Sequence, residues 1–106
     1  FVSESSIVSR AFGRIADRCT DLGLPLLSTM PDGGERGALL ALEVSPEEQG
    51  QLAAEFVARI LSGKKVQPPA IATPKKTDLV VNLKVARQLS LTVPFQVLSA
   101  ATRAIK

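Results

Sequence analysis

Hydrophobic positions in the first quarter of the chain recur at helical spacing. Between Ile7 and Leu22, apolar residues fall three or four positions apart, and arginine and aspartate occupy the positions between them. This pattern predicts an amphipathic helix. Ser3–Ser6 supplies several possible N-caps, and Gly23 is suited to the residue after the C-cap. Phe1-Val2, just before the helix, fits the tail of a strand.

Two apolar runs separated by a polar turn come next. Leu24–Thr29 carries a proline at its start, a position that strands tolerate. Gly37–Val44 is almost wholly apolar, which is typical of a strand covered on both faces. Met30–Arg36 between them is predicted to be a loop centred on Asp32-Gly33-Gly34.

A second helix is predicted from Ser45-Pro46-Glu47-Glu48, which combines an N-cap, a proline at the first position and a capping box. Apolar residues at helical spacing run from Leu52 to Leu61, and Gly63 ends the pattern. Gly50 in the first turns costs up to about 1 kcal/mol relative to alanine. Such a glycine is typical of close packing.

The last part of the chain is divided by prolines. Val66–Thr77 is predicted to be an extended connection, because prolines exclude regular helix there. Asp78–Leu83 is predicted to be a strand, Lys84–Leu89 a short helix and Phe95–Ile105 a closing helix.

Helices that alternate with covered strands predict an α/β fold. We expect three layers, with a mainly parallel sheet and helices on both faces. In open sheets of this kind, ligands bind beyond the carboxyl ends of the strands. This rule nominates Val2–Ser6, Ser28–Asp32 and Glu43–Ser45 as the edge that faces a cleft.

Composition limits the function classes. The 106 residues are 45% hydrophobic and 22% charged, which fits at most one globular domain with an aliphatic core. Without histidine, a Ser-His-Asp or Cys-His centre is impossible within the chain. The net charge of +3 includes the doublets Lys64-Lys65 and Lys75-Lys76, but no aromatic residues interleave them. Nucleic-acid binding is therefore not expected.

Few residues are candidates for chemistry. Ser3, Ser5 and Ser6 at a helix N-terminus can either seat an anion or simply cap the helix. Cys19 lies on the apolar face of the first helix, as a small buried hydrophobe does. Glu47-Glu48 is suited to the helix dipole, and Asp32-Gly33-Gly34 is either a ligand loop or a plain turn. No metal site or acid–base constellation emerges, so no enzyme is predicted.

The stretch Thr73–Pro94, T-P-K-K-T-D-L-V-V-N-L-K-V-A-R-Q-L-S-L-T-V-P, resembles the C-terminal signature of a bacterial family of ABC-transporter substrate-binding proteins. That family includes tryptophan- and tyrosine-binding members. Gln51–Lys65 resembles its long helix ending in Ile-Leu-x-Gly-Lys-Lys, and Ser3–Val8 lies where members carry an Asp-Asn-Thr-Val type segment. Glu43 and Ser90 stand where the family usually has glycine.

The resemblance implies a type I periplasmic-binding-protein-like fold, with residues 1–106 forming the C-terminal part of the second lobe. Such proteins hold a small, amino-acid-like solute between two lobes and deliver it to ABC permease subunits, with no cofactor and no bond made or broken. The implied location is extracytoplasmic, periplasmic or at the cell surface as a lipoprotein. The alternative is a sensor or interaction domain of the same fold without transport.

The same resemblance assigns ligand contacts to six residues of this chain: Glu4, Ser5, Ser6, Thr29, Met30 and Asp32. Loss of the family's Asp-Tyr-Tyr type segment at Ser45-Pro46-Glu47 disfavours an aromatic amino acid as solute. A chain that starts at Phe1 and matches a C-terminal signature is expected to be a fragment. With apolar surface exposed, we expect the fragment to form a homodimer.

Overall fold

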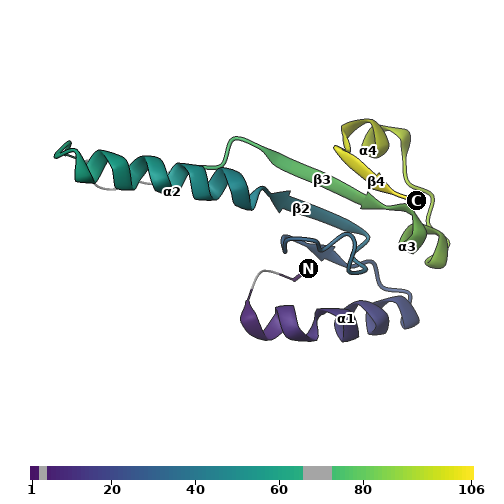
Figure 1. The fold of residues 1–106 in the computed structure, drawn as a ribbon. Helices are drawn as coiled ribbons and strands as arrows, with labels where there is room; N and C mark the ends of the chain where they lie inside the picture. Colours follow the sequence, from purple (N-terminus) through teal and green to yellow (C-terminus); the bar gives the residue numbers. More distant parts are fainter. Residues whose placement is uncertain (3–4, 66–72) are drawn as a thin grey trace. The chain divides into compact units, whose positions relative to one another are not determined.

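The computed structural model describes residues 1–2, 5–65 and 73–106 (Figure 1). In chain order the elements are α1 (Ser6–Asp21), β1 (Leu27–Ser28), β2 (Leu40–Val44), α2 (Pro46–Leu61), β3 (Thr77–Asn82), α3 (Leu83–Gln88), α4 (Phe95–Ala100) and β4 (Arg103–Ile105). Within these ranges, no helix is both long and apolar enough to cross a membrane.

The described strands form a four-stranded sheet in the order β1-β2-β3-β4. β1 pairs with β2 in parallel, with Ser28 opposite Ala41, and β3 pairs with β4 in parallel, with Val80 opposite Arg103. Val2 adds a parallel bridge to Ser28. The arrows of β2 and β3 point in opposite directions in Figure 1, so the centre of the sheet is antiparallel. The prediction of an α/β fold with a mainly parallel sheet flanked by helices is confirmed.

Two apolar clusters among the described residues hold helices to the sheet. Beneath α1, the buried side chains are those of Phe12, Ala16, Leu26, Met30 and Ala38. Beneath α3, the buried side chains are those of Leu39, Val85 and Ala86. The adjacent residues Ala38 and Leu39, just before β2, belong to different clusters.

The predicted closing helix Phe95–Ile105 was wrong beyond Ala100. The backbone becomes extended at Ala101, and Arg103–Ile105 forms β4 beside β3. The backbone N–H of Thr102 donates to the carbonyl of Leu79 at 2.9 Å, and its hydroxyl accepts from the N–H of Leu79 at 3.2 Å. The exposed edge of β3 offers backbone partners to this segment, and this pairing outweighs the local helical spacing.

The other boundaries differ mainly in extent. Both long helices end where predicted, with Gly23 and Gly63 at positive φ just after the C-caps Leu22 and Ser62. The predicted strand Leu24–Thr29 pairs only at β1. Part of the predicted extended connection, residues 66–72, lies outside the described residues.

Asn82 joins the sheet to the loop before β2. This residue ends β3 and caps α3, because its Oδ1 accepts from the N–H of Val85 at 3.0 Å. Its Nδ2 donates to the carbonyl of Gly34 at 2.8 Å. Gly34 lies so close to the sheet that an added Cβ would be 2.6 Å from Cγ1 of Val80. Glycine at this position allows the loop to rest on the strand.

The chain divides into two compact units. The first contains residues 1–43 and 78–106, with most of the sheet, and the second contains residues 44–77, with α2. In the second unit, Ser45 caps α2 by accepting from the N–H of Glu48 at 3.3 Å. The Glu48 carboxylate accepts from the backbone N–H groups of Lys75 and Lys76 at 3.0 and 3.2 Å. The start of α2 is thereby tied to the segment that leads into β3.

Candidate functional site

The register of the sheet aligns, within the first unit, the three segments that lead to the predicted cleft edge. Val2, Ser28 and Ala41 lie side by side on neighbouring parallel segments. Beyond this row the chain continues to the start of α1, to the loop after β1 and to Glu43 near the end of β2. The N-terminus of a 16-residue helix and two strand ends therefore share the carboxyl edge of the sheet.

Ser5 occupies the N-cap of α1. Its backbone is extended, and its Oγ accepts from the N–H of Val8 at 3.1 Å. Capping, one of the two alternatives left open by the sequence, is therefore confirmed for Ser5. The hydroxyl proton of Ser5 is not used by this bond, and Ser6 follows in the first turn, where the helix end carries partial positive charge. Ser5 and Ser6 are both exposed, while Glu4 lies outside the described residues.

The predicted residues after β1 divide into exposed and buried positions. Thr29 is exposed, and its backbone N–H donates to the carbonyl of Val2 at 3.3 Å. Met30 is only 2% exposed and packs in the cluster beneath α1, so its side chain belongs to the core. Its backbone is held locally, since its N–H donates to Oγ of Ser28 at 3.0 Å. Met30 can thus contribute to a binding edge only through its backbone.

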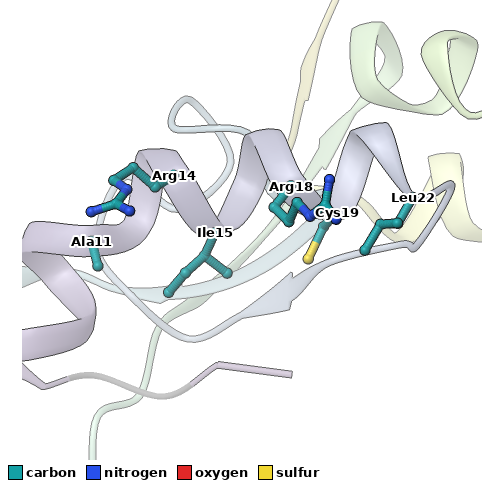
Figure 2. A pocket seen from close by; sticks show the side chains of 6 residues that line it. All are labelled: Ala11, Arg14, Ile15, Arg18, Cys19 and Leu22. Atoms are coloured by element: carbon teal, nitrogen blue, oxygen red, sulfur yellow. The ribbon is translucent and has the colours of Figure 1, made fainter.

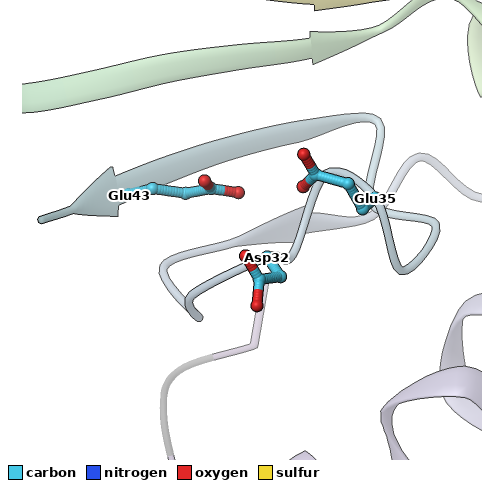
Figure 3. Close-up of side chains that lie close together, drawn as sticks. All are labelled: Asp32, Glu35 and Glu43. Atoms are coloured by element: carbon cyan, nitrogen blue, oxygen red, sulfur yellow. The ribbon is translucent and has the colours of Figure 1, made fainter. Parts of the chain in front are cut away.

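Asp32 is exposed and adopts a φ of 56°, in the left-handed region. Figure 3 shows its carboxylate together with those of Glu35 and Glu43, which come from the loop and from β2. One carboxylate oxygen from each of the three residues lies within 4.8 Å of the others. This acidic group forms at the carboxyl edge of β2.

Arg103 of β4 compensates part of this negative charge. Its guanidinium forms ion pairs with Glu35 and, at 3.3 Å, with Glu43. The second oxygen of Glu43 accepts from the N–H of Gly34 at 3.3 Å. The hydrogen bond from Arg103 holds the pKa of Glu35 below its ordinary value of 4.5, and the same bond raises the pKa of Arg103.

Arg103 was missed by the sequence reasoning because the predicted closing helix gave it no neighbour in the loop. Glu43 was placed at the predicted cleft edge and noted as a departure from the family's glycine, but its partner Arg103 was not predicted. A strand prediction for Arg103–Ile105 would have placed the Arg103 guanidinium beside β3 and thus near the loop carboxylates. The local sequence did not favour that strand over a helix.

A hollow in the surface lies elsewhere. It measures about 650 Å³ and is lined along α1 by Ala11, Arg14, Ile15, Arg18, Cys19 and Leu22 (Figure 2). Of the predicted ligand residues that the structure describes, none lines it. Ligand sites usually gather polar groups from several elements, and this hollow is one face of a single helix. Cys19 packs against the cluster beneath α1 but is only partly buried, whereas the sequence predicted a small buried hydrophobe.

Comparison with known proteins identifies the family. The profile described as "ABC transporter substrate binding protein" matches residues 1–105. The chain belongs to this family. The predicted relationship is therefore confirmed, and with it membership of a class of proteins that bind substrates. The comparison with curated proteins found no match.

Solved structures have the same fold. A conserved domain protein from Vibrio cholerae O1 biovar eltor is 29% identical, with a TM-score of 0.79, over 96% of this chain and 34% of that chain. A ligand-free, open substrate-binding protein with adhesive properties from Clostridium difficile is 23% identical, with a TM-score of 0.67. The match covers 99% of this chain and 35% of that chain. An ABC domain in complex with L-tryptophan from Streptococcus pneumoniae is 20% identical, with a TM-score of 0.72. The match covers 92% of this chain and 34% of that chain. The chain thus spans about a third of the length of these structures.

Proposed function

We propose that these residues are part of the extracytoplasmic solute-binding component of an ABC importer. The solute is a small molecule with an amino-acid-like carboxylate, bound between two lobes and delivered to permease subunits. Support for the transport role comes from the family to which the chain belongs. Support for the solute class comes from the geometry of the carboxyl edge and from the fold shared with a protein solved in complex with L-tryptophan.

The observation that carries this proposal is the parallel register of Val2, Ser28 and Ala41. In this proposal, the N-terminus of α1, which follows Val2 in the chain, and the exposed residues Thr29 and Asp32, which follow Ser28, contribute to one binding edge. Backbone N–H groups in the first turn of a helix, with its partial positive charge, favour a carboxylate. In this proposal, the hydroxyls of Ser5 and Ser6 add further donors for the carboxylate.

The proposal is tested by Ser5→Asp in the complete polypeptide. Aspartate caps a helix as well as serine does, so the thermal midpoint should stay nearly unchanged. Its charge would repel a bound carboxylate, so affinity should fall at least about tenfold, which is about 1.4 kcal/mol. Isothermal titration calorimetry with each of the twenty L-amino acids first identifies the binder, and the variant is then titrated with that amino acid.

Gln51→Glu is the matched control, since it adds the same charge at an exposed position of α2. It should leave affinity unchanged. Unaltered affinity in Ser5→Asp would remove α1 from the binding site. Absence of binding by every amino acid would refute the proposed solute class.

Self-association is proposed for the isolated 106-residue chain at high concentration. Exposed apolar side chains include Ile7 and Leu22 on α1 and Leu61 on α2. Such surfaces associate when nothing covers them. Light scattering across a concentration series should show the mass rising from monomer toward dimer, and a constant monomer mass would contradict this proposal.

A further inference from the structure

Arg103 separates the three carboxylates at the carboxyl edge of β2 into two that it binds and one that it does not. Its guanidinium forms ion pairs with Glu35 and Glu43, whose carboxylates point toward each other in Figure 3. Within residues 1–2, 5–65 and 73–106, the carboxylate of Asp32 forms neither an ion pair nor a hydrogen bond. All four residues belong to the first unit, so this arrangement does not depend on where residues 44–77 lie.

The charge of Arg103 is already compensated. The pKa of Arg103 is raised, mainly by its hydrogen bond with Glu35 and to a smaller extent by the charges of the three carboxylates. Glu43 accepts from the guanidinium with one oxygen and from the N–H of Gly34 with the other. A cation that two carboxylates neutralise is a weak partner for a third, because each further carboxylate repels those already bound. Arg103 is therefore not expected to hold a carboxylate of the solute.

Asp32 is held in place by its backbone, while its side chain stays exposed. Its φ of 56° lies in the left-handed region, and its carbonyl accepts from the N–H of Arg36 at 3.0 Å. The loop that carries it is fixed through Gly34, whose N–H donates to Glu43 and whose carbonyl accepts from Asn82. Asp32 thus presents a negative charge at a defined position. An ammonium group is the complementary partner, because hydrogen bonds between charged groups are stronger than those between neutral groups.

We propose that Arg103 is a positioning residue of the solute site, which by binding Glu35 and Glu43 leaves Asp32 to accept the α-ammonium group of the solute. This inference rests on the proposed function and deepens it, because it narrows the solute from a small carboxylate to a zwitterion. The first turn of α1 offers partial positive charge to the solute carboxylate, and Asp32 offers negative charge to its ammonium group. Without Arg103, the charges of Glu35 and Glu43 would repel the solute carboxylate.

Asp32→Asn in the complete polypeptide tests the contact with the ammonium group. Asparagine tolerates the left-handed region as aspartate does, so the loop should keep its shape. Two probes are titrated by calorimetry: the L-amino acid identified by the titrations above, and its deaminated analogue, which has hydrogen in place of the ammonium group (4-methylpentanoate in the case of L-leucine). Affinity for the amino acid should fall at least about tenfold, because a hydrogen bond between charged groups is lost, while affinity for the analogue should not fall. Asp21→Asn, which removes the same charge at the far end of α1, should leave both affinities unchanged.

Arg103→Gln tests the positioning role. Glu35 and Glu43 would lose their counter-charge, and they would repel the deaminated analogue, an anion, more than the amino acid, which carries no net charge. Affinity for the analogue should therefore fall at least about threefold more than affinity for the amino acid. Arg103→Lys retains the charge and should restore the wild-type ratio of the two affinities. Arg87→Gln, which removes an exposed arginine of α3, should leave this ratio unchanged.

Three results would overturn the inference. Unchanged or equally reduced affinities in Asp32→Asn would mean that Asp32 does not contact the ammonium group. An unchanged ratio in Arg103→Gln would mean that Arg103 only supports the loop or holds the solute carboxylate itself, because both probes carry that carboxylate. A lysine variant that behaves like Arg103→Gln would exclude a role for the charge. Each of these can occur while Ser5→Asp still weakens binding, so the inference fails separately from the proposed function; absence of binding by every amino acid would refute both.

Discussion

Asn82 is the residue whose replacement tests most directly how the loop before β2 is held. Its side chain accepts from the N–H of Val85 at 3.0 Å and donates to the carbonyl of Gly34 at 2.8 Å, and the residue is 4% exposed. Asn82→Ala removes both bonds. Loss of a helix N-cap costs about 0.5–2 kcal/mol. Leaving the buried Gly34 carbonyl without a partner costs a further 1–3 kcal/mol or so.

The two costs together come to about 3 kcal/mol, against a total stability of about 5–15 kcal/mol for an ordinary domain. With a urea m-value near 1.5 kcal/mol per molar, the unfolding midpoint should fall by about 2 M. Urea titration followed by circular dichroism measures this change. An equal m-value in wild type and variant would show that the same cooperative unit unfolds in both.

Two further variants separate the two bonds. Asn82→Ser retains an acceptor for the N–H of Val85, so it should cost roughly half as much as Asn82→Ala. Asn82→Asp also retains that acceptor, but it places a carboxylate oxygen against the Gly34 carbonyl in a buried position. It should therefore destabilise at least as much as alanine. If Asn82→Ala changes stability by less than about 0.5 kcal/mol, or if Asn82→Asp resembles wild type, the proposed attachment of the loop is wrong.

Three other predictions follow from local geometry. Ser90 has a φ of 56° just after α3, so Ser90→Gly should stabilise by about 1 kcal/mol and raise the thermal midpoint by a few degrees; a lower midpoint would contradict this. Gly34→Ala would place a Cβ 2.6 Å from Val80 and should cost about 1–3 kcal/mol, whereas Gly13→Ala, with no described atom within 4 Å, should not destabilise. Arg103→Ala should cost about 0.2–1 kcal/mol at pH 7. Because Arg103 lowers the pKa of Glu35, this stabilisation is present above the ordinary value of 4.5 and lost as pH falls through the lower folded value; equal losses at pH 7 and pH 3 in urea titrations would count against it.

The two long helices could be predicted because the signals that define them are local. Ser5 and Ser45 cap their own helices, and Gly23 and Gly63 end them, each through bonds to residues a few positions away. β4 could not be predicted in this way. Its apolar spacing fits a short helix equally well, and its strand conformation depends on β3, more than twenty residues earlier.

The acidic group of Asp32, Glu35 and Glu43 could not be predicted from the sequence for a similar reason. Arg103 and Glu35 are 68 residues apart in the sequence, and they meet only because of the order of strands in the sheet. For the predicted ligand residue Met30, the sequence predicted the position but not the direction of the side chain. Its position after β1 follows from the sequence, but the direction of its side chain into the core depends on how α1 packs.

The family signature affects the candidate site through Gly34. Asn82, within Thr73–Pro94, holds the carbonyl of this glycine, and Glu43 accepts a hydrogen bond from its N–H. Val80 of the signature leaves no space for a side chain there. Asp32 and Glu35 lie on either side of Gly33-Gly34 in the sequence. Because Gly34 is held by the end of β3, the positions of the two carboxylates depend on that strand end. The signature itself contributes none of the predicted ligand contacts, yet it fixes the loop that carries Asp32.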